Sequence, residues 1–323
     1  MFTSISILHF IFNQKLCCIT VSHEEIEILD KNFHIKASIK IPEDETSDTG
    51  IILVHGAIIN RQSLIRVDYS LAEYLCDELN AFVIVPDLQG ETTHRKDISF
   101  QSFSDIINIT TKHFAETYDL ENIAGFGHSM GCFVLAQSIK KHDIIDKIVT
   151  YGGPIRELEI TRQRGFLDYL IRYLSEYDYS LNIRNLMRYI FDKETCDYLD
   201  DVMLKEEVYC SENYNYVFES SMFLDFKNIV DDYIEIIKIW DKPALLLFGT
   251  EDGVTKKTLN HYADNTIEDN LIFKHIRGAS HITPCMNSRY QLSKFEPAVK
   301  FIKNKQFSEN NTISTCLNWP DKI

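Results

Sequence analysis

The sequence is short of positive charge. Its 323 residues include 33 Lys and Arg against 48 Asp and Glu, which gives a formal net charge of −15 at pH 7. A protein that binds nucleic acid needs a basic face to contact the phosphates, so this balance argues against a nucleic-acid partner. It also disfavours an anionic membrane surface. Acidic chains are common, however, and the charge by itself identifies no partner.

The sequence also lacks the cysteine patterns of metal sites. Its 8 cysteines are scattered along the chain, with no C-x-x-C pair and no Cys/His cluster at zinc spacing. Several of them stand in apolar runs, where a free thiol behaves as a small hydrophobic side chain. We therefore expect reduced thiols in a reducing compartment and a cytoplasmic location. The even count keeps disulfides open as the alternative.

Long apolar runs are missing as well: none reaches the roughly 18 residues of a membrane-spanning helix. Residues 1–12 are apolar, but they have neither the positively charged start nor the small-residue cleavage site of a signal peptide. We expect an extra N-terminal strand or a loosely attached lead-in here. Secretion through this segment stays the alternative, and the role of residues 1–16 is left open.

What the sequence does contain is an alternation of buried strands and helices. Hydrophobic residues make up 45% and charged residues 25%, as in a soluble globular protein with a full core. After a predicted hairpin over residues 17–29 and 33–41, apolar runs predict strands at 51–54, 81–85, 122–126, 147–151, 244–248 and 271–276. Helical patterns fall at 63–79, 100–118, 132–139 and 291–302. This order predicts an α/β fold, with a mostly parallel central sheet and helices on both faces.

One long segment interrupts the alternation. Residues 155–240 have no plausible buried strand, little Gly, and many Tyr, Phe and acidic residues. We interpret them as a helical lid inserted between two strands, although helices that simply pack their apolar faces would look the same. The predicted organisation is a core of residues 1–154 and 241–303, a lid of 155–240 and a polar C-terminal tail of 304–323.

The sequence Gly127-His128-Ser129-Met130-Gly131 fits G-x-S-x-G, the pattern of a nucleophile elbow. In an elbow the serine lies on a sharp turn from strand to helix, in a strained backbone conformation that exposes its hydroxyl. The flanking glycines are needed because side chains there would collide with the neighbouring strand and helix. A predicted strand precedes this motif and a predicted helix follows it, which is the context that the motif requires.

Two further residues complete a possible reaction centre. A serine attacks a carbonyl with the help of a histidine that takes its proton and a carboxylate that orients the histidine. Ser129, Asp252 and His281 each follow a predicted strand, and functional groups of a parallel sheet gather beyond such strand ends. Their order, Ser then Asp then His, is the order expected for this elbow. The competing candidates are Glu251 for the acid, and His261 and His275 for the base.

With these motifs, residues 51–302 resemble the α/β-hydrolase superfamily, in the capped branch that includes monoacylglycerol-lipase-like and serine-aminopeptidase-like hydrolases. The resemblance implies that Ser129 is the nucleophile, Asp252 the acid and His281 the base. It implies no metal or organic cofactor.

The resemblance also implies an oxyanion hole made of two backbone N–H groups, those of Ala57 and Met130. The sequence departs from the family in two places. Cys132 stands where the elbow usually has another Gly, and Glu91-Thr92 where a second Gly usually follows the Asp-containing turn of residues 86–90. Neither departure touches the chemistry. Three further polar residues near these motifs are expected to be structural: His55, Asp87 and His128.

The sequence therefore predicts a serine hydrolase that cleaves a carboxylic ester, thioester or amide through an acyl-enzyme on Ser129. The Tyr- and Phe-rich lid favours a small, partly apolar substrate. An acyltransferase on the same fold stays an alternative. So does a catalytically silent homologue that binds a ligand, or a lyase or cofactor-free oxygenase of this fold. The acyl group, the leaving group, the oligomeric state and the motion of the lid are left open.

Overall fold

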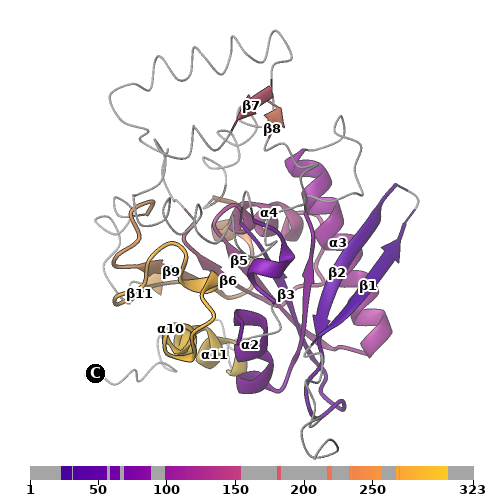
Figure 1. The fold of residues 1–323 in the computed structure, drawn as a ribbon, viewed down its shortest axis with the longest axis horizontal. Coiled ribbons are helices and arrows are strands. Elements are labelled where there is room, and N and C mark those ends of the chain that lie inside the picture. Colours follow the sequence, from indigo (N-terminus) through magenta and orange to yellow (C-terminus); the bar gives the residue numbers. More distant parts are fainter. Residues whose placement is uncertain are drawn as a thin grey trace, which may run out of the picture.

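A nine-stranded sheet forms the centre of the computed structural model (Figure 1). The structure describes residues 23–30, 32–56, 59–65, 69–88, 99–153, 180–182, 217–219, 233, 235–255, 267–268 and 270–304. The sheet order is β1-β2-β4-β3-β5-β6-β9-β11-β10. Its strands are β1 (Glu24–Leu29), β2 (His34–Lys40), β3 (Thr49–Val54), β4 (Phe82–Pro86), β5 (Asn122–His128), β6 (Lys147–Tyr151), β9 (Ala244–Gly249), β10 (Ile267–Glu268) and β11 (Leu271–Ile276).

The strands from β4 to β11 in this order all run parallel, and antiparallel pairing is confined to the two ends of the sheet. The predicted α/β fold with a mostly parallel sheet is therefore confirmed, as is the hairpin of β1 and β2. Parallel strands all place their carboxyl ends at one edge of the sheet, so residues far apart in the sequence meet there.

Helices cover both faces of the sheet (Figure 1). Along β3, Ile52 and Val54 pack with α3 and α4, whereas Ile51 and Leu53 pack with α2 and α11. A strand that is apolar at every position is thus buried on both sides. The helices are α2 (Leu71–Leu79), α3 (Phe100–Tyr118), α4 (Met130–Ile139), α10 (Arg289–Leu292) and α11 (Glu296–Lys303), with short 3₁₀ turns η1 (Arg61–Ser63), η3 (Thr283–Cys285) and η4 (Ser293–Phe295).

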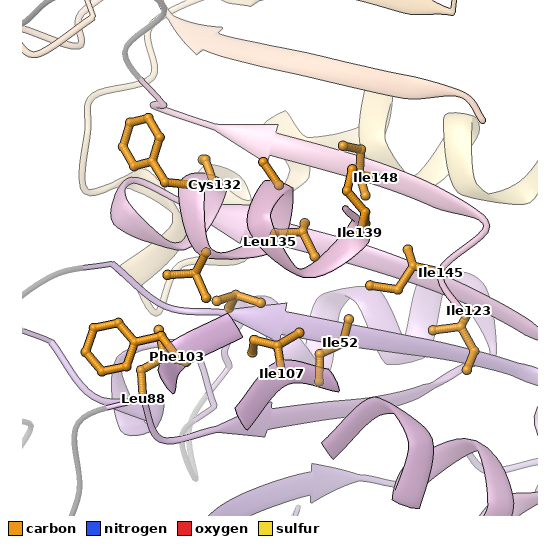
Figure 2. Close-up of a cluster of buried hydrophobic side chains, with 14 of the residues drawn as sticks. Ile52, Leu88, Phe103, Ile107, Ile123, Cys132, Leu135, Ile139, Ile145 and Ile148 are labelled. Carbon is orange, nitrogen blue, oxygen red and sulfur yellow. The ribbon is translucent and has the colours of Figure 1, made fainter. Parts of the chain in front are cut away.

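The apolar cluster between β3, α3 and α4 holds the central strands in place (Figure 2). Figure 2 shows Phe103 and Ile107 of α3 and Leu135 of α4 on the side of the sheet where Ile52 of β3 lies, with Ile139 of α4 beside Ile148 of β6. Leu135, Phe103, Ile107 and Ile52 are fully buried. Burying a side chain of this size contributes about 1.5–3 kcal/mol relative to leaving it exposed.

Two helix predictions are corrected by the structure. The helix expected over residues 63–79 begins only at Leu71, because the Ser70 side chain accepts a hydrogen bond from the Glu73 backbone N–H at 3.2 Å and caps it there. The helix expected over 291–302 is divided into α10, η4 and α11. Pro297 lies in the first turn of α11, where its missing N–H is tolerated, so a new helix begins at that point.

Most of the predicted lid lies outside the described residues, and so do residues 1–22 and 305–323. Within 155–240, β7 (Ser180–Asn182) and β8 (Val217–Glu219) pair antiparallel, which the prediction of helices did not include. Residues 235–239 are helical, and the Tyr233 hydroxyl donates to Thr150 Oγ1 at 2.8 Å. The lid therefore stays a prediction.

In the described part of the chain, no helix is both long enough and apolar enough to cross a bilayer. The cysteines described there are free and buried: Cys76, Cys132 and Cys285.

The contact between α4 and β3 yields a stability prediction. A Cβ added at Gly131 would overlap the Val54 carbonyl oxygen and lie 2.8 Å from that of His55. Ala is a better helix former than Gly. Any loss of stability in Gly131→Ala would therefore come from the overlap with these two carbonyl oxygens. We expect the free energy of unfolding to fall by about 1–3 kcal/mol, measured by urea denaturation. Gln137→Ala on the same helix is the control. Equal midpoints for the two variants would refute the close contact.

Candidate active site

Three predicted site residues lie together at the carboxyl edge of the sheet. Ser129 follows β5, Asp252 follows β9 and His281 comes a few residues after β11. The strands β5, β6, β9 and β11 are successive neighbours in the sheet. The structure thus brings Ser129 together with two residues that lie more than a hundred positions further along the chain.

Ser129 stands at a sharp turn between β5 and α4. Its backbone has φ 53° and ψ −118°, in the positive-φ region that residues other than glycine rarely adopt. Its N–H donates to the Tyr151 carbonyl at 2.9 Å, which ties the turn to the end of β6. Such strain persists only where the surroundings over-determine the conformation. Here β6 on one side and α4 on the other supply that constraint.

A chain of hydrogen bonds joins the three side chains. The distance from His281 Nδ1 to Asp252 Oδ2 is 3.0 Å, and that from His281 Nε2 to Ser129 Oγ is also 3.0 Å. Asp252 and His281 are buried, while Ser129 is partly exposed. With its Nδ1 proton directed at the carboxylate, the imidazole leaves Nε2 to accept the serine hydroxyl.

Asp252 is held as a carboxylate. Burial alone would raise its pKa, but the charge and hydrogen bond of His281, together with hydrogen bonds from Thr255, lower the pKa below its usual value. Oδ1 also accepts the backbone N–H groups of Val254 at 2.8 Å and Thr255 at 3.2 Å. Both carboxylate oxygens therefore have partners, which is the condition for keeping a charge in a buried place.

Gly152 makes room for this pair. It has φ +69°, and a Cβ built on it would lie 3.0 Å from His281 Nδ1 and 3.3 Å from Asp252 Oδ2. Both the backbone conformation and the space demand glycine. The sequence predicted only a strand that ends one residue earlier, at 151, and the position of Gly152 beside the His–Asp pair follows from the sheet order.

The two histidines expected to be structural are fully hydrogen-bonded. His55 Nδ1 donates to the Gly56 carbonyl at 2.8 Å, and its Nε2 accepts the Leu88 N–H at 3.1 Å. His128 Nε2 donates to the His281 carbonyl at 2.9 Å. Burial lowers the pKa of both imidazoles, that of His128 to about 3 with a further contribution from His281. Both are therefore neutral near pH 7.

The oxyanion-hole prediction is covered only in part. Met130 is the first residue of α4, where a backbone N–H has no carbonyl partner within the helix. Ala57 lies outside the described residues. Its neighbour Gly56 is buried against Ser129, since a Cβ on Gly56 would lie 3.1 Å from the Ser129 Cβ. The turn after β3 thus passes beside the serine.

That turn is anchored by Asp87, the residue after β4. Its Oδ1 accepts the Arg61 backbone N–H at 2.9 Å, and its Oδ2 pairs with the Arg61 guanidinium. Arg61 also pairs with Glu25 at 2.6 Å. Asp87 was expected to stabilise its own turn. It also holds Arg61, at the far end of the segment that follows β3.

The competing acid and bases take other positions. Glu251 is exposed, whereas Asp252 beside it is buried against His281. His275 lies within β11, and His261 is outside the described residues. Among the described residues, no group of three or more His, Cys, Asp or Glu is placed to hold a metal ion.

A scan against protein-family models and a search of curated proteins found no match. Solved structures do match. A candidate lipase from Acinetobacter baumannii AYE is 16% identical, with a TM-score of 0.57 and coverage of 93% of this chain and 97% of that one. A hypothetical protein from Pseudomonas aeruginosa is 13% identical, with a TM-score of 0.64 and coverage of 88% and 94%. A thermophilic esterase from Thermogutta terrifontis is 15% identical, with a TM-score of 0.51 and coverage of 87% and 100%. The chain has the α/β-hydrolase fold.

Within the α/β-hydrolase fold, two further residues pack beside the candidate site: Tyr151, which had no signal in the sequence, and Cys132, which the sequence marked only as a departure from the elbow pattern. Tyr151 ends β6, and its hydroxyl donates to the Ser280 carbonyl at 2.6 Å. Cys132 lies under the turn of Ser129, with Sγ 3.2 Å from the Gly127 carbonyl oxygen. Burial raises the pKa of the Cys132 thiol far above its usual value, so it packs as an apolar group.

The neutral state of His128 predicts a pH dependence of stability. The unfolded chain binds a proton here below the ordinary pKa of 6.5, but the folded chain stays neutral down to about 3. This contribution is complete above pH 6.5 and is lost as the pH falls. One proton corresponds to a slope of about 1.4 kcal/mol per pH unit. In urea titrations across this range, His128→Gln should show the smaller slope. Identical slopes would contradict a neutral, buried His128.

Proposed function

We propose that this protein is a serine hydrolase that cleaves a carboxylic ester, thioester or amide. The observation that carries the proposal is the chain of two 3.0 Å hydrogen bonds from Asp252 through His281 to Ser129. A hydroxyl, an imidazole and a carboxylate in this order make a serine nucleophilic at neutral pH.

In the proposed reaction, Ser129 Oγ attacks the substrate carbonyl carbon while His281 Nε2 takes its proton. The C–O or C–N or C–S bond to the leaving group then breaks, and His281 returns the proton to that group. The acyl-enzyme on Ser129 is next attacked by a water that His281 deprotonates, which releases the acid and the free serine. Asp252 keeps the imidazole in the required tautomer and stabilises its charged form.

The negative oxygen of the tetrahedral intermediate needs donors beside Ser129. We propose the backbone N–H groups of Met130 and Ala57 for this role. Support comes from the position of Met130 at the start of α4 and from the close approach of Gly56 to Ser129. A preorganised donor of this kind is worth about 3–4 kcal/mol of transition-state stabilisation.

For the substrate we propose a small, partly apolar molecule, enclosed by a lid of residues 155–240 over a core of 1–154 and 241–303. Support comes from the Tyr- and Phe-rich composition of the lid and from the fold shared with an esterase and a candidate lipase. The reaction as drawn uses only groups of the chain and a water.

The decisive test removes the nucleophile and the orienting acid separately. Ser129→Ala should abolish labelling by a fluorophosphonate probe and lower ester hydrolysis at least about 1000-fold. Asp252→Asn should keep the nucleophile but lower kcat by about 1000- to 10,000-fold, because the amide favours the wrong tautomer of His281. The assay uses p-nitrophenyl esters of increasing chain length, monoacylglycerols and aminoacyl amides.

Ser293→Ala is the matched control, because Ser293 is exposed and its hydroxyl donates to the Tyr290 carbonyl at 2.8 Å. It should label and hydrolyse like the unaltered protein. Full activity in Ser129→Ala would overturn the assignment of the nucleophile. Release of ester but not acid in the presence of an added alcohol would replace hydrolysis by acyl transfer.

A further inference from the structure

Two side chains outside the Ser129–His281–Asp252 chain hold the backbone on either side of His281. The Tyr151 hydroxyl donates to the Ser280 carbonyl at 2.6 Å, and His128 Nε2 donates to the His281 carbonyl at 2.9 Å. The first carbonyl belongs to the peptide plane before the His281 Cα, and the second to the plane after it. Fixing both planes fixes the φ and ψ of His281, and with them the direction of its side chain.

The two donors come from neighbouring places on the rigid sheet. His128 and Tyr151 are the last residues of β5 and β6 and are direct partners in the parallel register of these strands. Their ring centroids are 6.2 Å apart, and both side chains are buried. The spacing of the donors is therefore set by the pairing of two central strands, while the acceptors lie on a loop.

The loop has some order of its own, but it is local. The Ser280 N–H donates to Thr283 Oγ1 at 2.9 Å, and the Thr283 N–H donates back to the Ser280 carbonyl at 3.1 Å. These bonds shape a turn without relating it to Ser129. The Glu251 N–H, just after β9, also donates to the Ala279 carbonyl at 3.0 Å, two residues before His281. The bonds from Tyr151 and His128 are those that reach the carbonyls on either side of the His281 Cα.

His128 is suited to this contact because it donates without carrying a charge. Its Nδ1 faces Cys285 Sγ at 4.0 Å, which leaves the proton on Nε2 for the His281 carbonyl. Burial lowers the pKa of His128, and the nearby imidazoles of His281 and His55 lower it further. Asp252 raises it, but not enough to prevent the imidazole from staying neutral. The ring centroids of His128 and His281 are 5.3 Å apart. A positive charge on His128 would therefore disfavour the positive charge that the proposed reaction places on His281.

We infer that Tyr151 and His128 are positioning residues that together hold His281 within bonding distance of Ser129 and Asp252. The inference rests on the proposed function for its effect on rate. Its geometric part, the orientation of the His281 ring, can be measured without any substrate. Neither residue touches the reacting atoms in this arrangement, since both act through the backbone of residues 280 and 281.

The first test is Tyr151→Phe, which removes one hydroxyl from a buried ring. We expect kcat for ester hydrolysis to fall by about 10- to 100-fold, because small misplacements of a catalytic group cost this much. KM should stay within about twofold, since the substrate contacts are unchanged. The labelling rate with fluorophosphonate should fall in parallel with kcat.

Thr111→Val is the matched control. It removes an equally buried hydroxyl, which donates to the Ile107 carbonyl at 2.7 Å on α3, outside the proposed site and the proposed lid. Both variants should lose thermal stability to a similar degree, but only Tyr151→Phe should lose rate. Equal kcat in the two variants would overturn the inference for Tyr151.

For His128 the test compares His128→Leu with His128→Gln. Leu fills the space without a donor and should lower kcat as Tyr151→Phe does, whereas Gln keeps an N–H donor and should restore most of the rate. A Gln variant as slow as the Leu variant would overturn the role of the donor. If His128→Leu does not fold, a His128→Gln variant as slow as Tyr151→Phe would still overturn the role of the donor.

A spectroscopic measurement separates this inference from the proposed function. The proton between His281 Nδ1 and Asp252 should give a low-field resonance in the NMR spectrum of the unaltered protein. That resonance should broaden or shift upfield in Tyr151→Phe and stay unchanged in Thr111→Val. If Ser129→Ala kept full activity, the proposed function would fail and this result would still stand. If the resonance did not respond, the positioning role would fail and the proposed function would be untouched.

Discussion

The parallel pairing of β5, β6, β9 and β11 is the constraint on which the site depends. Each of these strands ends at the same edge of the sheet and delivers one group there: Ser129, Tyr151, Asp252 and His281. A slip of one residue in any pairing would turn that strand's side chains to the opposite face. Because both faces are packed with apolar side chains, such a slip would expose a core. The packing of the core therefore also fixes the positions of the polar groups at the strand ends.

The polar groups at this edge are buried and yet supplied with partners. Asp252 shares its two oxygens among His281 and two backbone N–H groups, and His55 uses both ring nitrogens. Where water is excluded, each such bond is stronger and each missing one is more costly. The polar groups at the end of the sheet are thus already held in place by bonds within the chain, as the hydrolysis proposed above would require.

Much of the fold could be read from the sequence because each central strand is a continuous apolar run. The strands 147–151 and 271–276 and the helix 100–118 were predicted with their observed bounds. The failures have physical causes. The cap by Ser70 and the proline at 297 divide helices that a periodic pattern alone would extend. The strands β7 and β8 are only three residues long, too short for an alternation to be visible.

For the candidate site, the sequence predicted the three side chains that lie together. The G-x-S-x-G motif marks Ser129, and the order Ser, Asp, His marks Asp252 and His281. It did not predict the roles argued for Tyr151 and Gly152. Their importance depends on which strands are neighbours, and that order is 5-6-9-11 among the labelled strands, a property of the sheet rather than of any local pattern. His128 was expected to be structural, and its bond to the His281 carbonyl gives that expectation a specific content.

The order of the sheet has one more consequence, for how such a chain can change. The strands β6 and β9 are direct neighbours, although residues 152–243 separate them in the sequence. The chain leaves and re-enters the sheet one strand apart, so the two ends of the intervening segment are held together whatever its length. Doubling the length of a closed loop costs only about 0.6 kcal/mol of entropy. Changes of length between residues 153 and 233 would thus cost little closure entropy and leave the hydrogen-bonded groups at the strand ends in register.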